Sequence, residues 1–180
     1  MIITVDENIR LELLAQPHAV ALFAAIEDSR EHLAKFLPWV HKMNTVQDFA
    51  NYISHCIKLH KELHEVSFAI VVDDVPVGRI GLHHLNLLNK AGSIGYWLAK
   101  NAGGKGIVIR SCKQLITYGF EQVGLHRIEI KTATENFKSQ AIPEKLNFKK
   151  EGILRQAELI NNVFLDLYIY SMLSQDWKSL

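Results

Sequence analysis

The chain has 180 residues, of which 48% are hydrophobic, and its formal net charge is +1. This length and apolar content fit one domain spanning residues 1–180 with a sizeable core. A net charge near zero excludes the broad positive field of non-specific nucleic-acid binders. Without a membrane-spanning apolar run or a basic signal segment, we expect a cytoplasmic protein that does not enter a membrane.

The first third of the chain reads as one strand followed by three helices. Ile9–Leu14 alternates between apolar and polar residues, which is typical of a strand. Pro17 favours the start of a helix, and a second, short helix is expected at Arg30–Leu37. Thr45 followed by Asp48 resembles a capping box, so a third helix is predicted to begin there.

The middle of the chain predicts a hairpin and then a crossover. Val66–Val72 and Val75–Leu85 are apolar segments on either side of an Asp-Asp turn. Ser93–Leu98 is the next expected strand, followed by a long amphipathic helix at Gly106–Val123 and a strand at His126–Ala133. A strand–helix–strand crossover implies that these two strands pair locally in parallel.

The last part of the chain predicts one more helix and a second hairpin. Asn136–Leu146 has a helical pattern that includes Pro143. Ile153–Ile160 and Phe164–Leu173 are expected strands, because the Asn-Asn pair between them is a strong hairpin signal. The element order is that of a mixed α/β domain, and the apolar C-terminal strands are compatible with a homodimer.

A glycine-rich loop opens the long helix and indicates a phosphate ligand. Gly103, Gly104 and Gly106 surround Lys105, directly before an apolar helical run. Glycines let the backbone approach a ligand closely, and a helix N-terminus offers unpaired N–H groups and a positive dipole end. A phosphate or pyrophosphate group suits both features.

Two common phosphate loops do not fit this sequence. A Walker A loop requires a hydroxyl residue after its lysine, whereas Gly106 follows Lys105, and Ala99 stands at its first glycine. A dinucleotide fingerprint requires a third glycine where Ile109 stands. A nucleotide-binding switch is therefore disfavoured.

Short motifs follow one another along most of the chain. They are IGYWL at Ile94–Leu98, GKG at Gly104–Gly106, LHRIE at Leu125–Glu129, NFKS at Asn136–Ser139, EKLNF at Glu144–Phe148, RQAE at Arg155–Glu158 and DLYIYS at Asp166–Ser171. In this order and spacing they resemble the GNAT superfamily of N-acetyltransferases. The resemblance is to its RimJ/RimL branch, which acetylates protein N-termini, notably of ribosomal proteins.

The resemblance implies a fold and a donor substrate. The fold is a mixed α/β GNAT domain, with a twisted, mostly antiparallel sheet of about seven strands. It has one splayed parallel pair, and helices flank both faces. The donor is acetyl-CoA, and no metal is implied.

The resemblance also implies where the coenzyme binds. Its pyrophosphate would rest on the backbone of the glycine loop, and its pantetheine arm would pair with the preceding strand, where the N–H near Leu98 polarises the thioester. The implied coenzyme-binding residues are Tyr96, Trp97, Leu98, Gly103, Gly104, Lys105, Gly106, Ile107, Val108, Asn136 and Ser139. Arg110, Lys113 and Lys131 are alternatives for the ribose phosphate.

Glu158 and Ser139 are the implied catalytic residues. Glu158 would be the general base, since apolar neighbours on its strand raise a carboxylate pKa toward neutrality. The strand carboxylates Asp166 and Glu129 are rivals, and Glu158 can also be read as a surface residue. Ser139 would protonate the departing sulfur, or it can act with Asn136 as a helix cap.

The proposed chemistry favours an α-amine as acceptor. An α-amine has a pKa of about 7.7 and a lysine about 10.4. Deprotonation at pH 7 therefore costs roughly 1 kcal/mol for the α-amine and roughly 4.6 kcal/mol for the lysine. Trp39, in a loop after a proline, is the expected acceptor-binding residue. A polyamine or antibiotic acetyltransferase, and a coenzyme-binding module without catalysis, remain as rivals.

The cysteines and histidines suggest neither an acyl-enzyme nor a metal site. Cys56 and Cys112 fall in helices as small buried residues, so we expect direct acetyl transfer. His60 and His64 share the spacing of a metal-binding pair, but no third ligand is evident.

Overall fold

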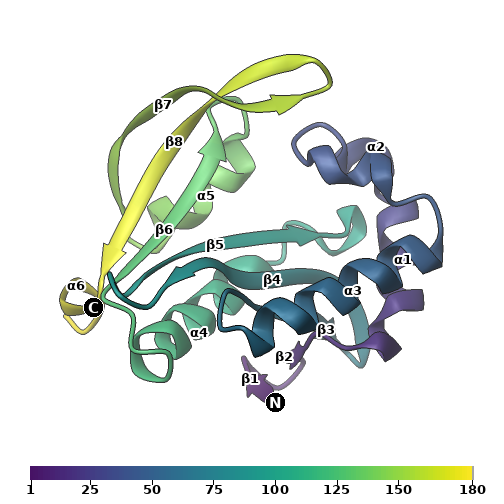
Figure 1. Cartoon of the computed structure of the whole chain (residues 1–180), viewed down its shortest axis with the longest axis horizontal. Helices are drawn as coiled ribbons and strands as arrows, with labels where there is room; N and C mark the ends of the chain where they lie inside the picture. Colours follow the sequence, from purple (N-terminus) through teal and green to yellow (C-terminus); the bar gives the residue numbers. More distant parts are fainter. Residues whose placement is uncertain (180) are drawn as a thin grey trace.

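The computed structural model describes residues 1–179, which form one eight-stranded sheet in the order β1-β2-β3-β4-β5-β6-β8-β7 (Figure 1). The strands are β1 Ile2–Thr4, β2 Ile9–Leu13, β3 Val66–Val72, β4 Val75–Asn86, β5 Ala91–Leu98, β6 Arg127–Ala133, β7 Lys149–Ile160 and β8 Val163–Leu173. The β5–β6 pair is parallel and the other pairs are antiparallel. The expected mixed α/β fold with one parallel pair is confirmed.

Within residues 1–179, six α-helices and three short 3₁₀ helices accompany the strands. They are η1 Gln16–His18, α1 Ala19–Glu27, α2 Arg30–Leu33, η2 Pro38–Lys42, α3 Val46–Lys61, η3 Lys100–Ala102, α4 Ile107–Glu121, α5 Phe137–Lys145 and α6 Ser174–Trp177. The capping box is present, since Thr45 accepts from the Asp48 N–H and Asp48 from the Thr45 N–H. Among residues 1–179, no helix is both long and apolar enough to cross a membrane.

Some boundaries differ from the sequence expectation. β1, a three-residue strand, and the four-residue α6 were not predicted, so the sheet has eight strands rather than about seven. The helix expected at Arg30–Leu37 ends at Leu33, and β7 begins at Lys149, four residues before Ile153. β7 is a largely exposed edge strand, so its first residues carry little apolar periodicity to reveal it.

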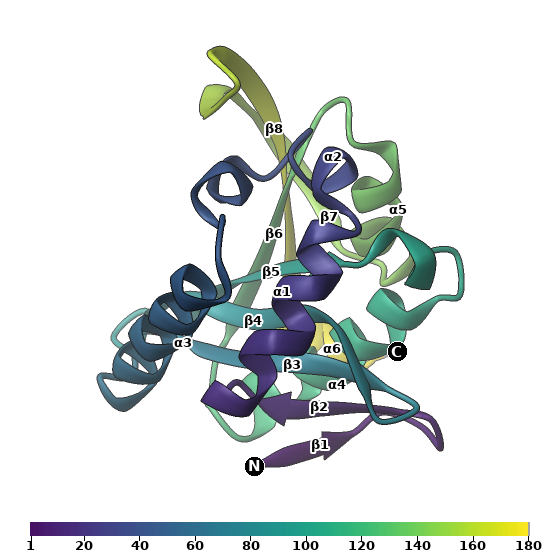
Figure 2. The same ribbon diagram turned by 90° about the vertical axis from the view of Figure 1, so that its right-hand side faces the viewer.

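Helices cover both faces of the sheet (Figure 2). α1 and α3 lie on one face, called here the α3 face, where α3 buries Phe49, Ile53 and Cys56 against a core that includes Trp97. α4 packs on the opposite face, the α4 face, over a core that includes Phe68 and the other cysteine, Cys112. Both cysteines are free and buried, as expected.

The parallel strands β5 and β6 separate part-way along their length. Their pairing runs from Ala91–Arg127 to Ile94–Ile130, although β5 continues to Leu98 and β6 to Ala133. Beyond Ile94, β6 pairs with β8 and not with β5. The result is a V-shaped gap in the sheet, with its apex at Ile94 and its open end beside the loop that leads into α4.

Candidate active site

On the edge of β5 that faces the gap, backbone N–H groups beyond Ile94 have no hydrogen-bond partner on β6. The Ala99 N–H donates to the Val77 carbonyl on β4 at 2.8 Å. Because successive residues of a strand direct their N–H groups to opposite sides, Trp97 and Gly95 also face β4, whereas Tyr96 and Leu98 face the gap. A peptide-like ligand entering the gap therefore meets two N–H donors.

The glycine loop adopts the backbone conformation that only glycine takes up without strain. Gly104 has φ of +80° and Gly106, the N-cap of α4, has φ of +69°. A Cβ at Gly104 would meet no atom within 4 Å, so this position is open to solvent. The first turn of α4 carries no acidic side chain. The loop thus directs a helix N-terminus at an accessible surface suited to an anion.

Ser139 is held at the N-terminus of α5, on the α4 face of the gap. Asn136 caps this helix, because its side chain accepts from the Ser139 N–H at 3.2 Å. The Tyr96 hydroxyl lies 3.1 Å from both the carbonyl oxygen and the Oγ of Ser139. Burial raises the Tyr96 pKa, so this phenol stays protonated and can donate.

Pro143 explains why Tyr96 is needed there. In an α-helix the carbonyl of residue i accepts from the N–H of residue i+4, and Pro143, four residues after Ser139, has no N–H. The Ser139 carbonyl would be left without its helical donor, and the Tyr96 hydroxyl supplies one. The hydroxyl of Tyr96 can at the same time accept from the Ser139 Oγ.

Glu158 lies on the α3 face, beyond a bulge in β7. Leu154 pairs with Leu167 and Glu158 with Leu165, so four steps along β7 match two along β8. Paired residues lie on the same face of the sheet. Leu165 and Leu167, two residues apart on β8, both lie on the α3 face, so Glu158 lies on that face too. The Glu158 carboxyl is half-buried, and this desolvation raises its pKa above the usual range.

The rival carboxylates already have structural partners. Asp166 accepts from the Gln156 N–H at 2.7 Å and thereby stabilises the bulge. Glu129 pairs with Arg127 at 2.9 Å and with Lys131 at 3.6 Å. Burial raises the pKa of Glu158, which is the direction that suits a general base.

A model of the acetyltransferase (GNAT) domain matches residues 8–149 of the chain. This is most of its length, and it includes the gap and the glycine loop. The chain belongs to the GNAT acetyltransferase family.

Similar proteins lie in the expected branch of that family. The putative ribosomal N-acetyltransferase YdaF of Bacillus subtilis is 33% identical over 97% of this chain and 96% of its own. The ribosomal-protein-serine acetyltransferase of Escherichia coli is 28% identical over 94% of both chains. The structure of RimL, a ribosomal L7/L12 alpha-N-protein acetyltransferase in complex with coenzyme A, matches with a TM-score of 0.94. It is 25% identical and covers 98% of this chain and 99% of its own.

This GNAT domain therefore uses acetyl-CoA and needs no metal. Its gap donors and glycine loop are the features suited to a peptide-like arm and a pyrophosphate. Among residues 1–179, no three His, Cys, Asp or Glu side chains are grouped as metal ligands. His64 lies past the end of α3, so it does not continue the helical face of His60 as the sequence suggested.

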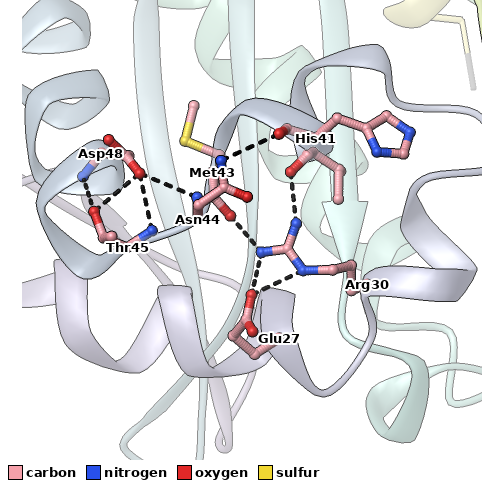
Figure 3. A network of polar contacts seen from close by, with 8 residues as sticks. Glu27, Arg30, His41, Met43, Asn44, Thr45 and Asp48 are labelled. Atoms are coloured by element: carbon pink, nitrogen blue, oxygen red, sulfur yellow. Dashed lines mark hydrogen bonds and ion pairs between the residues drawn. The ribbon is translucent and has the colours of Figure 1, made fainter.

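The α3 side of the gap is bounded by the segment after α2. Trp39 in η2 stacks on Tyr52 with centroids 6.5 Å apart and lies 6.0 Å from Trp97. Arg30 holds this segment by donating to the Val40 carbonyl at 2.8 Å and to the Met43 carbonyl, and it pairs with Glu27 (Figure 3). Trp39 is thus fixed in place, with part of its surface exposed.

The β7–β8 hairpin meets the same segment. The Asn161 side chain, at the hairpin turn, accepts from His41 Nε2 at 2.8 Å and donates to the Ala34 carbonyl at 3.2 Å. Figure 1 shows the hairpin extending over toward α2. These contacts join the β7–β8 hairpin to the segment after α2 across the α3 side of the gap. The sequence indicated Asn161 as a turn residue only, and no local pattern revealed its partners.

Not every expected coenzyme residue directs its side chain at the gap. The Trp97 side chain is buried in the α3-face core, and its N–H faces β4. Ile107 is also buried in the core, which leaves only its N–H for a ligand. Arg110 lies beside the glycine loop but pairs with Asp6 at 3.0 Å. Lys131, on β6, pairs with Glu129.

Proposed function

We propose that this GNAT enzyme transfers the acetyl group of acetyl-CoA to the N-terminal α-amine of a protein, with a ribosomal protein as the leading candidate. The observation that carries the proposal is the placement of Glu158 and Ser139 on opposite faces of the same gap. An amine can then approach from the α3 face while the sulfur departs toward the α4 face. The names of the similar proteins support the choice of acceptor.

In this proposal the coenzyme is held by backbone groups. Its pyrophosphate is bound by the N–H groups of Gly103–Val108, with Lys105 adding positive charge. The pantetheine arm pairs with the free edge at Tyr96 and Leu98, whose N–H groups face the gap. One of them polarises the thioester carbonyl and stabilises the oxyanion that forms on attack, and Leu98 is our choice.

Glu158 and Ser139 then transfer protons on the α3 face and the α4 face of the gap, respectively. Glu158 accepts a proton from the acceptor nitrogen as the C–N bond forms, and its raised pKa suits that role near neutrality. Ser139 donates its hydroxyl proton to the sulfur as the C–S bond breaks. Trp39 lines the acceptor side. Both cysteines are buried and burial raises the pKa of each thiol, so neither supplies a thiolate and the transfer is direct.

The test is acetyl-CoA consumption with a panel of N-terminal peptides and polyamines, using wild type, Glu158→Gln and Ser139→Ala. We expect turnover on peptides and a loss of about a hundredfold in Glu158→Gln. Glu135→Gln, an exposed carboxylate change, is the matched control and should keep full activity. Turnover on polyamines alone would favour the small-molecule rival. Coenzyme binding without turnover on any amine would favour a binding module.

A further inference from the structure

A buried polar cluster lies on the α3 face, next to the apex of the gap, and the mechanism above does not use it. Glu65, just before β3, is 9% exposed and accepts from Arg79 Nη2 at 2.5 Å. Ser67 also donates to Glu65. The second Glu65 oxygen lies 3.0 Å from Nδ1 of His83 on β4. The Arg79 guanidinium lies over the Tyr52 ring, 5.3 Å from its centroid.

These contacts fix the state of the His83 ring. Although burial raises the Glu65 pKa, the hydrogen bond from His83 and the charge of Arg79 hold it well below its usual range. An ionised Glu65 places the imidazole proton on Nδ1, which leaves Nε2 with a free lone pair. Burial lowers the His83 pKa against the opposing effect of Glu65, so the ring is neutral near pH 7.

The free nitrogen of His83 points at the apex of the gap. A Cβ added at Gly95 would lie 2.9 Å from His83 Nε2, so the ring lies directly over the Gly95 backbone. Gly95 is the first residue of β5 beyond the last β5–β6 pair. It also precedes Tyr96, whose N–H faces the gap. The His83 side chain is 19% exposed, so it remains in contact with solvent.

The overall reaction requires two protons to leave the acceptor nitrogen. An ammonium must lose one proton before it can attack, and the adduct loses a second when it becomes an amide. One proton ends on the coenzyme sulfur and the other is released to solvent. Glu158 accounts for one removal, and a second acceptor on the same face can account for the other.

We propose that His83 Nε2 removes the first proton from the acceptor ammonium, with Glu65 as its positioning residue. The amine then attacks the thioester carbon, Glu158 takes the second proton, and Ser139 protonates the sulfur as the C–S bond breaks. Glu158 then releases its proton to water and Ser139 takes one back from water, so that in balance one of the two protons is delivered to the sulfur. His83 returns its proton to water through its exposed edge. This inference rests on the acceptor approaching from the α3 face and not on which amine it is.

Other ionisable groups near His83 do not provide the same function. Arg79 is permanently charged, and Tyr52 and Cys56 on α3 have pKa values raised by burial, so both stay protonated. The centroid of the His84 ring lies 6.4 Å from that of the His83 ring. His84 is exposed, and its backbone has φ of +51°. Asn tolerates this backbone conformation, which makes His84→Asn a matched control for His83→Asn.

The kinetic test compares these two variants across pH with a peptide acceptor that carries an N-terminal α-amine. An Asn at position 83 can still donate to Glu65 but cannot accept a proton, so only the roughly 6% of an α-amine that is already free at pH 6.5 can react, and kcat/KM for the acceptor should fall about tenfold. The loss should shrink above pH ~8, where an α-amine with a pKa of about 7.7 is already free. The KM for acetyl-CoA and the His84→Asn variant should be unchanged. A loss that is equal at every pH, or no loss, would overturn the proposal.

A second measurement needs neither a variant nor an acceptor. NMR of the histidine ring nitrogens in the wild-type protein should show His83 neutral at pH 7, protonated at Nδ1 and unprotonated at Nε2. A ring that is charged at pH 7, or protonated at Nε2, would contradict the assignment. This result is independent of the acceptor, so it separates failure of the His83 role from failure of the proposed function.

Discussion

Tyr96→Phe removes the hydroxyl that replaces the missing helical donor of Ser139. The change leaves the ring in place but takes a donor from the Ser139 carbonyl and a partner from Ser139 Oγ, both at 3.1 Å. Leaving a buried acceptor unsatisfied costs about 1–3 kcal/mol. For a domain of this size each kcal/mol lowers Tm by about 2–4 °C.

The partner variant Pro143→Ala makes this prediction specific. Alanine at this position restores the N–H that the Ser139 carbonyl lacks, so the Tyr96 hydroxyl is no longer its only donor. In a double-mutant cycle, Tyr96→Phe should therefore cost less in the Pro143→Ala background than in the wild type. The assay is urea unfolding of the four proteins. Equal costs in both backgrounds would refute the reasoning.

The same pair can be followed in catalysis. If Tyr96 orients the Ser139 hydroxyl, Tyr96→Phe should lower kcat by about tenfold, which corresponds to about 1.4 kcal/mol. In the Ser139→Ala background, Tyr96→Phe should then lower kcat little further, because the hydroxyl that Tyr96 orients is already gone. Losses that multiply would show that Tyr96 acts on the reaction without Ser139.

Three further variants test separate parts of the site and fold. Gly106→Ala places a side chain at φ of +69°, so it should destabilise the fold by about 1–2 kcal/mol and raise the KM for acetyl-CoA, measured by denaturation and kinetics. Thr45→Ala removes the cap of α3 and should cost about 1 kcal/mol in unfolding free energy without changing kcat. Glu158→Gln should lower activity yet raise Tm at pH 7. The folded-state pKa of Glu158 is raised, so its stability contribution is present at acid pH and is lost as pH rises through that pKa. A lower Tm at pH 7 would contradict this sign.

The residues that the sequence could identify are those whose role is local. The Thr45 capping box, the glycines before α4 and the Asp-Asp and Asn-Asn turns all act through the backbone next to them, so a short pattern carries the information. The alternation and crossover patterns likewise sufficed for seven of the eight strands and for the parallel pair.

The residues that the sequence could not identify act across long distances in the chain. Tyr96 and Ser139 are 43 residues apart, and His41 and Asn161 are 120 apart. Pro143 removes one helical donor, and Tyr96, which replaces it, lies on another element of the fold. Glu65, Arg79 and His83 form a cluster only because β3 and β4 pair in one register. No periodicity in one sequence reports such contacts.

The most direct test of the account uses one peptide that carries both a free N-terminal α-amine and a lysine. After brief reaction with acetyl-CoA at pH 7, fragment masses locate the acetyl group. The difference in deprotonation cost between the two amines is about 3.6 kcal/mol, so we predict acetylation at the N-terminus with the lysine left free. Acetyl on the lysine, or no reaction with the peptide while a polyamine is acetylated, would contradict the proposal.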